Sequence, residues 1–571
     1  RHPSPVCEKT TTTAGTMMAT PRCRSCAPVL LAVVAVLLCG GVSAVLAVHL
    51  QDNSSPLQDD AGLTIQTTSG PVEGYVKEDG VRMFLGVPYA APPVGDLRWA
   101  NPVSPSSWTD VRPAKTFSAG CPQDCELPPG TCPEKVSEDC LYLNVYTPAV
   151  DKIKAPLPVL VFLHGGRFEQ GAGGTFFYSG IWMANNTDIV VVTINYRMGA
   201  TGFLVTDELA GNFGIEDQRF AFAWVKANIA NFGGNPDDIT VDGQSAGGTS
   251  IAYHLVAKNS KNLFHRAIVE SNPWALPLKD VSDSIRWGHD FASKIGCSRH
   301  DVACMRSKSW EQVVQAQKDV SVFTLHFLGK VYRWSPVIGT DDVPGQPIEL
   351  IQKGEFNAMP LIVGNTRDEG LMFIYMGVEK PVPRWELDIA ITAIFGVNAL
   401  KVLEEYKVPA NMTSDTRPIL AEMGTDYMFA CPNRAVIRSL NMFSHYPSYA
   451  YFFDRVLPWP NAWGPMYPYC DGQVCHGSEL VYVFNSAWSH DPAWEFTSGG
   501  KVLSECMGAY WGSFVGHNDP NYEAVLRNCP RWSPWDLESE EGQVLDVPIS
   551  STRRRYETHC DFWDKIGYIH S

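Results

Sequence analysis

Residues 239–250 read ITVDGQSAGGTS, and the fold of the surrounding chain follows from this stretch. An apolar, β-branched run enters it and predicts a strand, whereas TSIAYHLVAK, residues 249–258, predicts a helix. Ser245 stands on the turn between them, with Gly243 and Gly247 two residues away on either side. Side chains at those two positions would collide in so sharp a turn, so glycine is needed at both. The pattern is typical of a nucleophile elbow, the tight turn that presents a reactive serine hydroxyl.

A nucleophilic serine needs a base, an acid that orients the base, and hydrogen-bond donors for the oxyanion. The sequence VFLHGGRF, residues 161–168, ends a predicted strand in His164, Gly165 and Gly166. Glycines let backbone N–H groups approach a substrate oxygen closely. Because this turn lies upstream of Ser245, we interpret it as the source of those donors rather than as an ordinary glycine-rich turn.

Apolar runs of strand length recur along the chain, and helical patterns lie between several of them. The runs cover residues 158–163, 188–196, 239–241, 266–271, 360–364 and 449–453. Residues 216–234 carry apolar side chains at helical spacing, and Gly233–Gly234 can end that helix. Continuous apolar strands that alternate with helices predict an α/β fold, with a mostly parallel sheet covered on both faces. In such a sheet the active site lies at the carboxyl ends of the strands.

The amino-acid composition and the net charge limit the kinds of molecule that this protein can bind. The chain has 571 residues, of which 45 % are apolar and 19 % charged, as in ordinary globular proteins. Its formal net charge of −16 argues against nucleic-acid binding, which needs a basic face. We find no internal repeat and no second linker, so a single domain over residues 63–571 is the simplest organisation.

The cysteines predict an oxidising compartment. Sixteen are present, and twelve of them lie beyond residue 120. An even number spread in this way indicates disulfides. Zinc binding is the weaker interpretation, because no two close-set ligand pairs occur. We therefore expect no metal site.

The N-terminal region agrees with that compartment. Residues 1–26 form an extension, residues 27–50 an apolar segment, and residues 51–62 a polar linker. The apolar segment is either a cleaved secretory signal peptide or an uncleaved signal anchor that spans the membrane. Both place the remaining chain outside the cytosol. The sequons at Asn185 and Asn411 are candidate glycosylation sites in that location, and a third at Asn53 is weakened by a following proline.

Several longer blocks together resemble the type-B carboxylesterase family, over roughly residues 64–565. These are VRMFLGVPYAAPPVGDLRW at 81–99, SEDCLYLNVYTP at 137–148 and the GQSAGG motif around Ser245. The resemblance implies an α/β-hydrolase fold with a large central sheet. It also implies a serine hydrolase that cleaves small carboxylic esters through an acyl-enzyme intermediate, without a cofactor.

The resemblance assigns the other members of a catalytic triad. The block GNTRDEG, residues 364–370, makes Glu369 the acid, with its neighbour Asp368 as the alternative. The block CHGSELVYVF, residues 475–484, makes His476 the base. The order serine, acid, histidine is the one this fold uses. The expected oxyanion hole consists of backbone N–H groups, from Gly165, Gly166, Arg167 and Ala246.

The resemblance also implies the disulfides Cys121–Cys140, Cys297–Cys304 and Cys431–Cys529. Six cysteines then remain. Proximity along the chain suggests the pairs Cys125–Cys132 and Cys470–Cys475, which leaves Cys506–Cys560.

Three departures from the family leave the substrate open. Arg167 stands where the family usually has glycine or alanine, and its guanidinium either faces the pocket, where it would favour an acidic acyl group, or packs elsewhere. Gln244 replaces the usual glutamate before the nucleophile. Residues 121–140 contain no aromatic residue, whereas cholinesterases carry a choline-binding tryptophan there. The alternative function is that of a weakly active or inactive, cholinesterase-like adhesion or structural protein.

Overall fold

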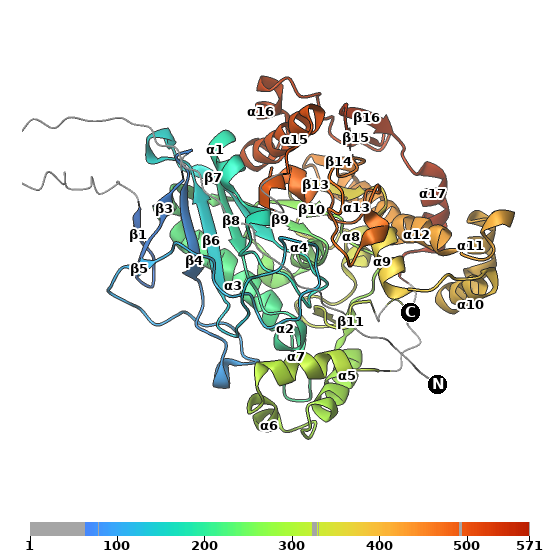
Figure 1. Cartoon of the computed structure of the whole chain (residues 1–571), viewed down its shortest axis with the longest axis horizontal. Coiled ribbons are helices and arrows are strands. Elements are labelled where there is room, and N and C mark those ends of the chain that lie inside the picture. Colours follow the sequence, from blue (N-terminus) through green and yellow to red (C-terminus); the bar gives the residue numbers. More distant parts are fainter. Residues whose placement is uncertain (1–62, 78, 323–327, 329–330, 490–493, 570–571) are drawn as a thin grey trace, which may run out of the picture. The chain divides into compact units, whose positions relative to one another are not determined.

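The predicted apolar runs form the middle of a large sheet in the computed structural model, which describes residues 63–569 except 78, 323–327, 329–330 and 490–493 (Figure 1). Within these residues the sheet has eleven strands in the order β16-β15-β14-β13-β10-β9-β7-β8-β6-β4-β3. The six strands predicted from the sequence are β7 (Leu157–Leu163), β8 (Val190–Ile194), β9 (Gly234–Gln244), β10 (Arg266–Glu270), β13 (Leu361–Thr366) and β14 (Ser448–Phe453).

The sheet is parallel in its middle and antiparallel at its ends. Each of the six predicted strands pairs in parallel with its neighbours in that set, and β15 (Glu541–Leu545) extends the parallel part beyond β14. Antiparallel pairs join the end strands β16 (Ser550–Arg553), β6 (Tyr142–Thr147), β4 (Arg82–Pro88) and β3 (Tyr75–Val76). The prediction of a mostly parallel sheet is confirmed.

Alternate residues of the central strands face opposite sides of the sheet. Val159 and Val161 of β7 pack in one hydrophobic cluster, with α2 (Gly199–Phe203), α3 (Phe213–Asn228) and α4 (Ala246–Val256). Leu160 and Phe162 pack in a second cluster, with α1 (Ile181–Asn186) and α15 (Ser498–His517). Figure 1 shows the two groups of helices on opposite sides of the strands. Since both faces are covered, apolar residues at every strand position are buried, and the runs are continuous rather than alternating.

The predicted helix at 216–234 differs at both ends from the observed one. Helix α3 begins three residues earlier, at Phe213, and ends at Asn228, after which residues 229–232 form a 3₁₀ turn. Gly233 follows with φ 94°, a left-handed conformation that suits glycine at a helix end. The apolar spacing continues through the 3₁₀ turn, so it predicted a longer helix than the backbone adopts.

The remaining elements surround this core or extend from it. The helices are α5 (Val281–Lys294), α6 (Val302–Arg306), α7 (Trp310–Asp319), α8 (Pro347–Gln352), α9 (Glu369–Gly377), α10 (Arg384–Phe395), α11 (Ala399–Glu405), α12 (Arg417–Thr425), α13 (Cys431–Phe443), α14 (Leu480–Val483), α16 (Asn521–Leu526) and α17 (Glu557–Ile566). Two small sheets consist of β1 (Thr64–Gln66), β2 (Pro71–Glu73) and β5 (Arg112–Pro113), and of β11 (Lys279–Asp280) and β12 (Val337–Ile338).

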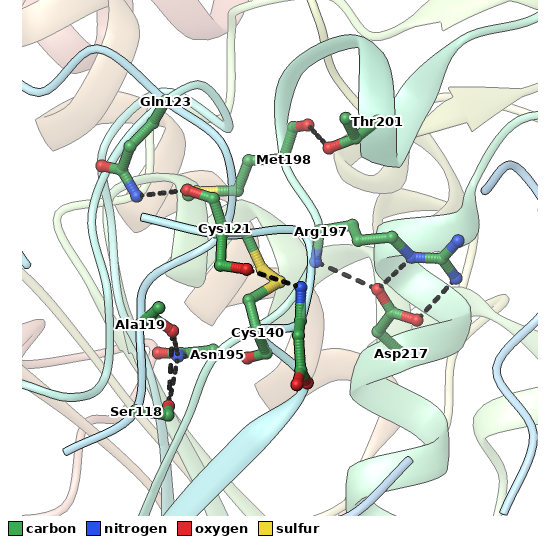
Figure 2. Close-up of a disulfide and its surroundings, with 12 residues drawn as sticks. Ser118, Ala119, Cys121, Gln123, Cys140, Asn195, Arg197, Met198, Thr201 and Asp217 are labelled. Carbon is green, nitrogen blue, oxygen red and sulfur yellow. Dashed lines mark hydrogen bonds and ion pairs between the residues drawn. A yellow bond between two sulfur atoms is a disulfide. The ribbon is translucent and has the colours of Figure 1, made fainter. Parts of the chain in front are cut away.

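Four of the six disulfides join the pairs predicted from the sequence, namely Cys121–Cys140, Cys125–Cys132, Cys297–Cys304 and Cys470–Cys475. Figure 2 shows the first of these together with Asn195, whose side-chain amide donates a hydrogen bond to the carbonyl of Cys140 at 3.2 Å. The first two disulfides enclose nested loops within residues 121–140.

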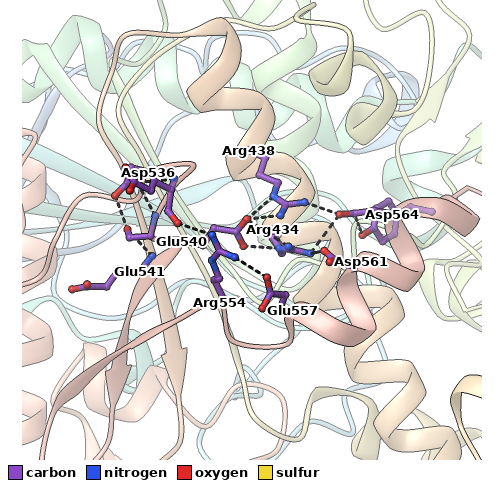
Figure 3. Close-up of polar contacts among 12 residues, drawn as sticks. Arg434, Arg438, Asp536, Glu540, Glu541, Arg554, Glu557, Asp561 and Asp564 are labelled. Atoms are coloured by element: carbon purple, nitrogen blue, oxygen red, sulfur yellow. Dashed lines mark hydrogen bonds and ion pairs between the residues drawn. The ribbon is translucent and has the colours of Figure 1, made fainter.

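The other two predicted pairs are wrong, because their partners are exchanged. Cys431 pairs with Cys560 instead of Cys529, and Cys506 pairs with Cys529 instead of Cys560. After Cys529 the chain passes through β15 and β16 and returns in α17 beside α13, the helix that begins at Cys431. An ion-pair network between Arg434 of α13 and residues of α17 joins the same two helices (Figure 3). The packing of these helices therefore determines which cysteines pair. The spacing of the cysteines along the chain does not indicate it.

The predicted extension, apolar segment and linker, residues 1–62, lie outside the described residues. Within the described part of the chain, no helix has both the length and the hydropathy that a bilayer crossing requires.

Candidate active site

Ser245 lies on the turn between β9 and α4, where the sequence predicts it. Its backbone has φ 59° and ψ −120°, a strained conformation for a residue with a side chain. The Ser245 N–H donates to the carbonyl oxygen of Glu270 on β10 at 3.0 Å, which fixes the turn to the neighbouring strand. The side chain of Ser245 is 5 % exposed and lines a cavity at the carboxyl ends of the strands.

Each of the two flanking glycines is required for a different steric reason. A Cβ atom on Gly243 would lie 2.6 Å from the backbone of Gly247, which is the collision expected across the turn. A Cβ atom on Gly247 would lie 2.0 Å from the carbonyl oxygen of Leu163, at the end of β7. Real Cβ atoms do not approach other heavy atoms so closely. The second glycine is therefore required by the adjacent strand and not by the turn itself.

The loop after β7 approaches Ser245 closely. A Cβ atom on Gly165 would lie 2.9 Å from the Cβ of Ser245, and one on Gly166 would lie 2.0 Å from the carbonyl oxygen of Gln170. Among the described residues, none accepts a hydrogen bond from the N–H of Gly166 or Arg167. Ala246 begins α4, and the first N–H groups of a helix have no partner within it. Gly166 and Arg167 line the same cavity as Ser245, and Ala246 follows Ser245 in the chain.

His476 and Glu369 are in direct contact. His476 Nδ1 lies 2.5 Å from Glu369 Oε2, and the other carboxylate oxygen accepts the backbone N–H of Thr366 at 2.7 Å. Glu369 is fully buried and His476 is 8 % exposed. The rings of Phe373 and Phe429 pack on the imidazole, with centroid distances of 4.9 and 5.4 Å. The imidazole is therefore held by the Glu369 carboxylate and by contacts with two aromatic rings.

Asp368, the alternative acid, contacts the loop before His476 instead of its imidazole. Its Oδ2 accepts the N–H of Val474 at 2.8 Å, and its own N–H donates to the carbonyl of Val474 at 3.0 Å. The Cys470–Cys475 disulfide closes the same loop. Asp368 and the disulfide thus hold the loop that precedes His476, and Glu369 contacts the imidazole ring itself.

Gln244 is a contact that the sequence analysis missed. Its side-chain nitrogen lies 3.2 Å from His476 Nε2. An amide NH₂ can only donate, so Nε2 accepts, and Nδ1 carries the proton that faces Glu369. This is the neutral tautomer in which Nε2 can act as a base. The sequence shows glutamine at position 244, where the family usually has glutamate, but no local pattern indicates which residue Gln244 contacts.

The cavity brings the predicted residues together. Ser245, His476, Gly165, Gly166 and Arg167 all line it. Other walls come from Leu127, Pro128 and Thr131 of the disulfide-bonded segment, and from apolar and aromatic side chains including Met372, Phe373, Met376, Trp463, Tyr467 and Leu480. A pocket with mostly apolar walls and a few polar groups at one point suits a small organic ligand.

Three buried carboxyl groups lie behind this site and were also missed. We call Asp242, Glu270 and Glu479 the carboxyl cluster; each is fully buried. Trp511 Nε1 donates to Glu270 at 2.9 Å, and Ser271 Oγ donates to Glu479 at 3.1 Å.

Burial raises the pKa of all three groups in the carboxyl cluster. For Asp242 burial raises the pKa to about 7. For Glu270 and Glu479 burial, together with the neighbouring carboxyl groups, raises the pKa well above the ordinary value. No described arginine, lysine or histidine forms an ion pair with any of the three. The cluster therefore favours its protonated, neutral form.

The two candidate glycosylation residues differ in exposure. Asn411 is exposed in a 3₁₀ turn, whereas Asn185 is half-buried near the end of α1, where its side-chain oxygen accepts a hydrogen bond from Lys152 at 2.7 Å.

Comparisons with known proteins identify relatives over most of the chain. The model of the carboxylesterase family matches residues 61–563. The crystal protein of Dictyostelium discoideum is 35 % identical over 505 residues, covering 88 % of this chain and 90 % of that protein. The acylcarnitine hydrolase of Mus musculus is 33 % identical, covering 91 % of this chain and 93 % of its own. A solved structure of a PNB esterase superposes with a TM-score of 0.74 at 30 % identity, covering 89 % of this chain and all of that one.

Proposed function

The chain belongs to the carboxylesterase family, and from this premise we propose that it is a serine hydrolase that cleaves small carboxylic esters. Ser245 is the proposed nucleophile, His476 the base and Glu369 the acid. The observation that carries the proposal is the 2.5 Å contact between His476 and Glu369 beside a cavity that Ser245 also lines. We assign the activity to one domain over residues 63–571.

The proposed reaction is a two-step acyl transfer. His476 Nε2 takes the proton of Ser245 as its oxygen attacks the ester carbonyl carbon, and the hydrogen bond from Gln244 is given up at that moment. Glu369 accepts the hydrogen bond from Nδ1 and stabilises the imidazolium. The protonated His476 then gives its proton to the departing alcohol. Water attacks the acyl-enzyme in the same way and releases the acid.

The N–H groups of Gly165, Gly166, Arg167 and Ala246 are the proposed donors to the tetrahedral oxyanion. Loss of one such donor typically costs about 10²–10³ in rate. The side chain of residue 167 does not affect whether its N–H can donate, so the arginine is compatible with this role. No step in this scheme needs a metal or an organic cofactor.

The test compares Ser245→Ala with a matched serine variant. We expect Ser245→Ala to lower the kcat/KM for nitrophenyl esters by about 10⁴-fold or more, because the nucleophile is lost. Ser250→Ala is the control: Ser250 is a buried serine of the same helix that accepts a hydrogen bond from Gln218 at 2.9 Å and does not line the cavity.

Equal rates in the Ser245→Ala variant and the unmodified protein would refute the assignment. A complete absence of ester hydrolysis in the unmodified, folded protein would instead support the adhesion or structural function. The contact between His476 and Glu369, beside a cavity that Ser245 and His476 both line, is the reason for preferring the enzyme.

We also propose that the domain works outside the cytosol. Six disulfides are typical of proteins that fold in an oxidising compartment. The exposed Asn411 is the better placed of the two proposed glycosylation sites. Secretion and membrane anchoring through residues 27–50 are the two routes.

A further inference from the structure

We propose that the guanidinium of Arg167 binds an anionic group of the substrate, so that the preferred esters carry a carboxylate or a similar anion. This inference rests on the proposed ester hydrolysis and adds a substrate class to it. It uses a side chain that the acyl-transfer chemistry does not need, since only the backbone N–H of residue 167 contributes to the oxyanion hole.

The Arg167 guanidinium reaches the wall of the cavity. Its Nη1 lies 3.8 Å from the sulfur of Met376, and Met376 is itself a lining residue. Tyr467 is another lining residue, and the positive charge of Arg167 affects its pKa. Burial raises the pKa of this tyrosine, and Arg167 opposes the rise. Of the two orientations left open by the sequence, the structure thus favours the one that faces the pocket.

The cavity holds no carboxylate to neutralise this charge. Among the described lining residues there is no aspartate, glutamate or lysine, and Arg167 is the one permanently charged side chain. Glu169 lies two residues after Arg167, but its carboxylate accepts hydrogen bonds from Arg333, at 2.7 and 3.2 Å. No described carboxylate forms an ion pair with Arg167.

A half-buried guanidinium beside a thioether, on the wall of a mostly apolar cavity, is a poorly solvated cation. Such a group gains more from an anion than an exposed arginine does, because water screens it less. Its planar fork of donors matches a carboxylate or a phosphate with two parallel hydrogen bonds. The chemistry of the site therefore selects an anion of that shape.

The backbone adds an independent argument. Arg167 has φ 59° and Phe168 has φ 60°, both in the left-handed region where a residue with a Cβ atom is strained. Glycine would adopt this conformation without cost at position 167. A strained arginine on the wall of a cavity is a pattern expected of a residue that serves a ligand.

Contacts of the neighbouring residues hold the loop that carries Arg167 in place. The Gly199 N–H donates to the carbonyl of Phe168 at 2.6 Å, and the ring of Phe168 packs on those of Phe203 and Tyr332. Farther along, the Gln123 side chain donates to the carbonyl of Gly171 at 2.8 Å and accepts its N–H at 2.7 Å. A guanidinium on a fixed loop can discriminate between ligands, because little ordering is left to occur on binding.

The anion can belong to the acyl part or to the alcohol part of the ester, and the experiment separates the two. One pair of substrates is 4-nitrophenyl hydrogen glutarate and 4-nitrophenyl pentanoate, which differ by a charge on the acyl chain. The other pair is 4-acetoxybenzoate and 4-acetoxytoluene, which differ by a charge on the alcohol. For each pair the measured quantity is the ratio of the kcat/KM of the charged ester to that of the neutral one.

We expect Arg167→Gln and Arg167→Met to lower this ratio by about 10-fold or more in one of the two pairs, as the loss of a charge-assisted hydrogen bond predicts. Because the ratio compares two esters in the same variant, a general loss of activity cancels. Arg167→Gly is made in parallel, since glycine suits the left-handed backbone and keeps the test open should the other variants fold poorly. Arg286→Gln, which removes an exposed arginine of α5, should leave both ratios unchanged.

Unchanged ratios in both pairs for all three Arg167 variants would overturn the proposal. Failure of the proposed function looks different: the unmodified protein would then hydrolyse none of the four esters, or Ser245→Ala would hydrolyse them equally well.

Discussion

Two groups of carboxyl groups in this protein have opposite electrostatic surroundings. The carboxyl cluster behind the candidate site forms no ion pair with a cation in the described part of the chain. The second group, which we call the arginine-paired cluster, consists of Arg434, Arg438, Glu540, Asp561 and Asp564 (Figure 3). There the Arg434 Nε lies 2.7 Å from Glu540, and Arg438 contacts both Glu540 and Asp564.

The pKa values move in opposite directions as a result. Burial raises the pKa of Asp242 to about 7. At Glu540 burial acts in the same sense, but the guanidiniums of Arg434 and Arg438 outweigh it and lower the pKa. For Asp564 burial wins despite the same arginines, and the pKa is raised. Burial alone therefore does not decide the charge of a carboxyl group; the balance between desolvation and a paired cation does.

The largest effect is expected from breaking the arginine-paired cluster. Glu540→Gln removes a negative charge between two arginines, one of which, Arg434, is 8 % exposed. We expect the variant to lose about 2–3 kcal/mol of the free energy of unfolding at pH 7, because a buried cation loses its main partner. Denaturant unfolding without reducing agent measures the loss. A change below about 0.5 kcal/mol would show that Asp561 and Asp564 suffice for both arginines.

A smaller and pH-dependent effect is expected in the carboxyl cluster. A raised pKa in the folded state means that the stability contributed by Asp242 is present below its ordinary value of 3.8 and is lost as the pH rises through about 7. Asp242→Asn keeps the shape but cannot ionise. The variant should differ least from the unmodified protein near pH 4, where the Asp242 carboxyl group is largely protonated in the unfolded state too, and should exceed it at pH 8 by at least about 1 kcal/mol.

The measurement for Asp242→Asn is the free energy of unfolding at a series of pH values. Glu540 supplies the contrast, because a lowered pKa contributes stability above its ordinary value of 4.5 that is lost as the pH falls. Parallel curves for Asp242→Asn and the unmodified protein from pH 5 to pH 8 would contradict the assignment of a neutral carboxyl group there.

The smallest effect is expected where an ion pair is exposed. Arg384 and Asp388 lie one turn apart on α10, with side chains 37 and 42 % exposed and a contact of 2.7 Å. We expect Asp388→Asn to cost at most about 0.5 kcal/mol, since water screens the pair. It serves as the matched control for Glu540→Gln in the same denaturant experiment. If Asp388→Asn lowers the free energy of unfolding as much as Glu540→Gln does, the ion pairing and not the burial of the carboxylate determines the size of the loss.

Much of the fold was predictable because its signals are local. Each central strand appears in the sequence as a short apolar run, and the turn at Ser245 appears as two glycines at fixed spacing. The resemblance to a family then located Glu369 and His476, which the structure places in contact. Helix α3 shows the limit, because apolar spacing alone does not distinguish its last α-helical turn from the 3₁₀ turn that follows.

Contacts between distant segments were not predictable from the same signals. The pairing of Cys431 with Cys560 depends on α17 returning beside α13, which no spacing records. The contact between Gln244 and His476 joins residues 232 positions apart. The carboxyl cluster likewise gathers three acids that are unremarkable one by one in the sequence.

The amino-acid sequence by itself indicated the central strands and the turn at Ser245, because periodicity, glycine spacing and residue type act over a few positions. Only the tertiary structure decided which cysteines join, which carboxyl groups are buried together without an ion-pair partner among the described residues, and that Arg167 lines the cavity. Those properties depend on distance and burial, and distance and burial exist only once segments far apart in the chain have packed together.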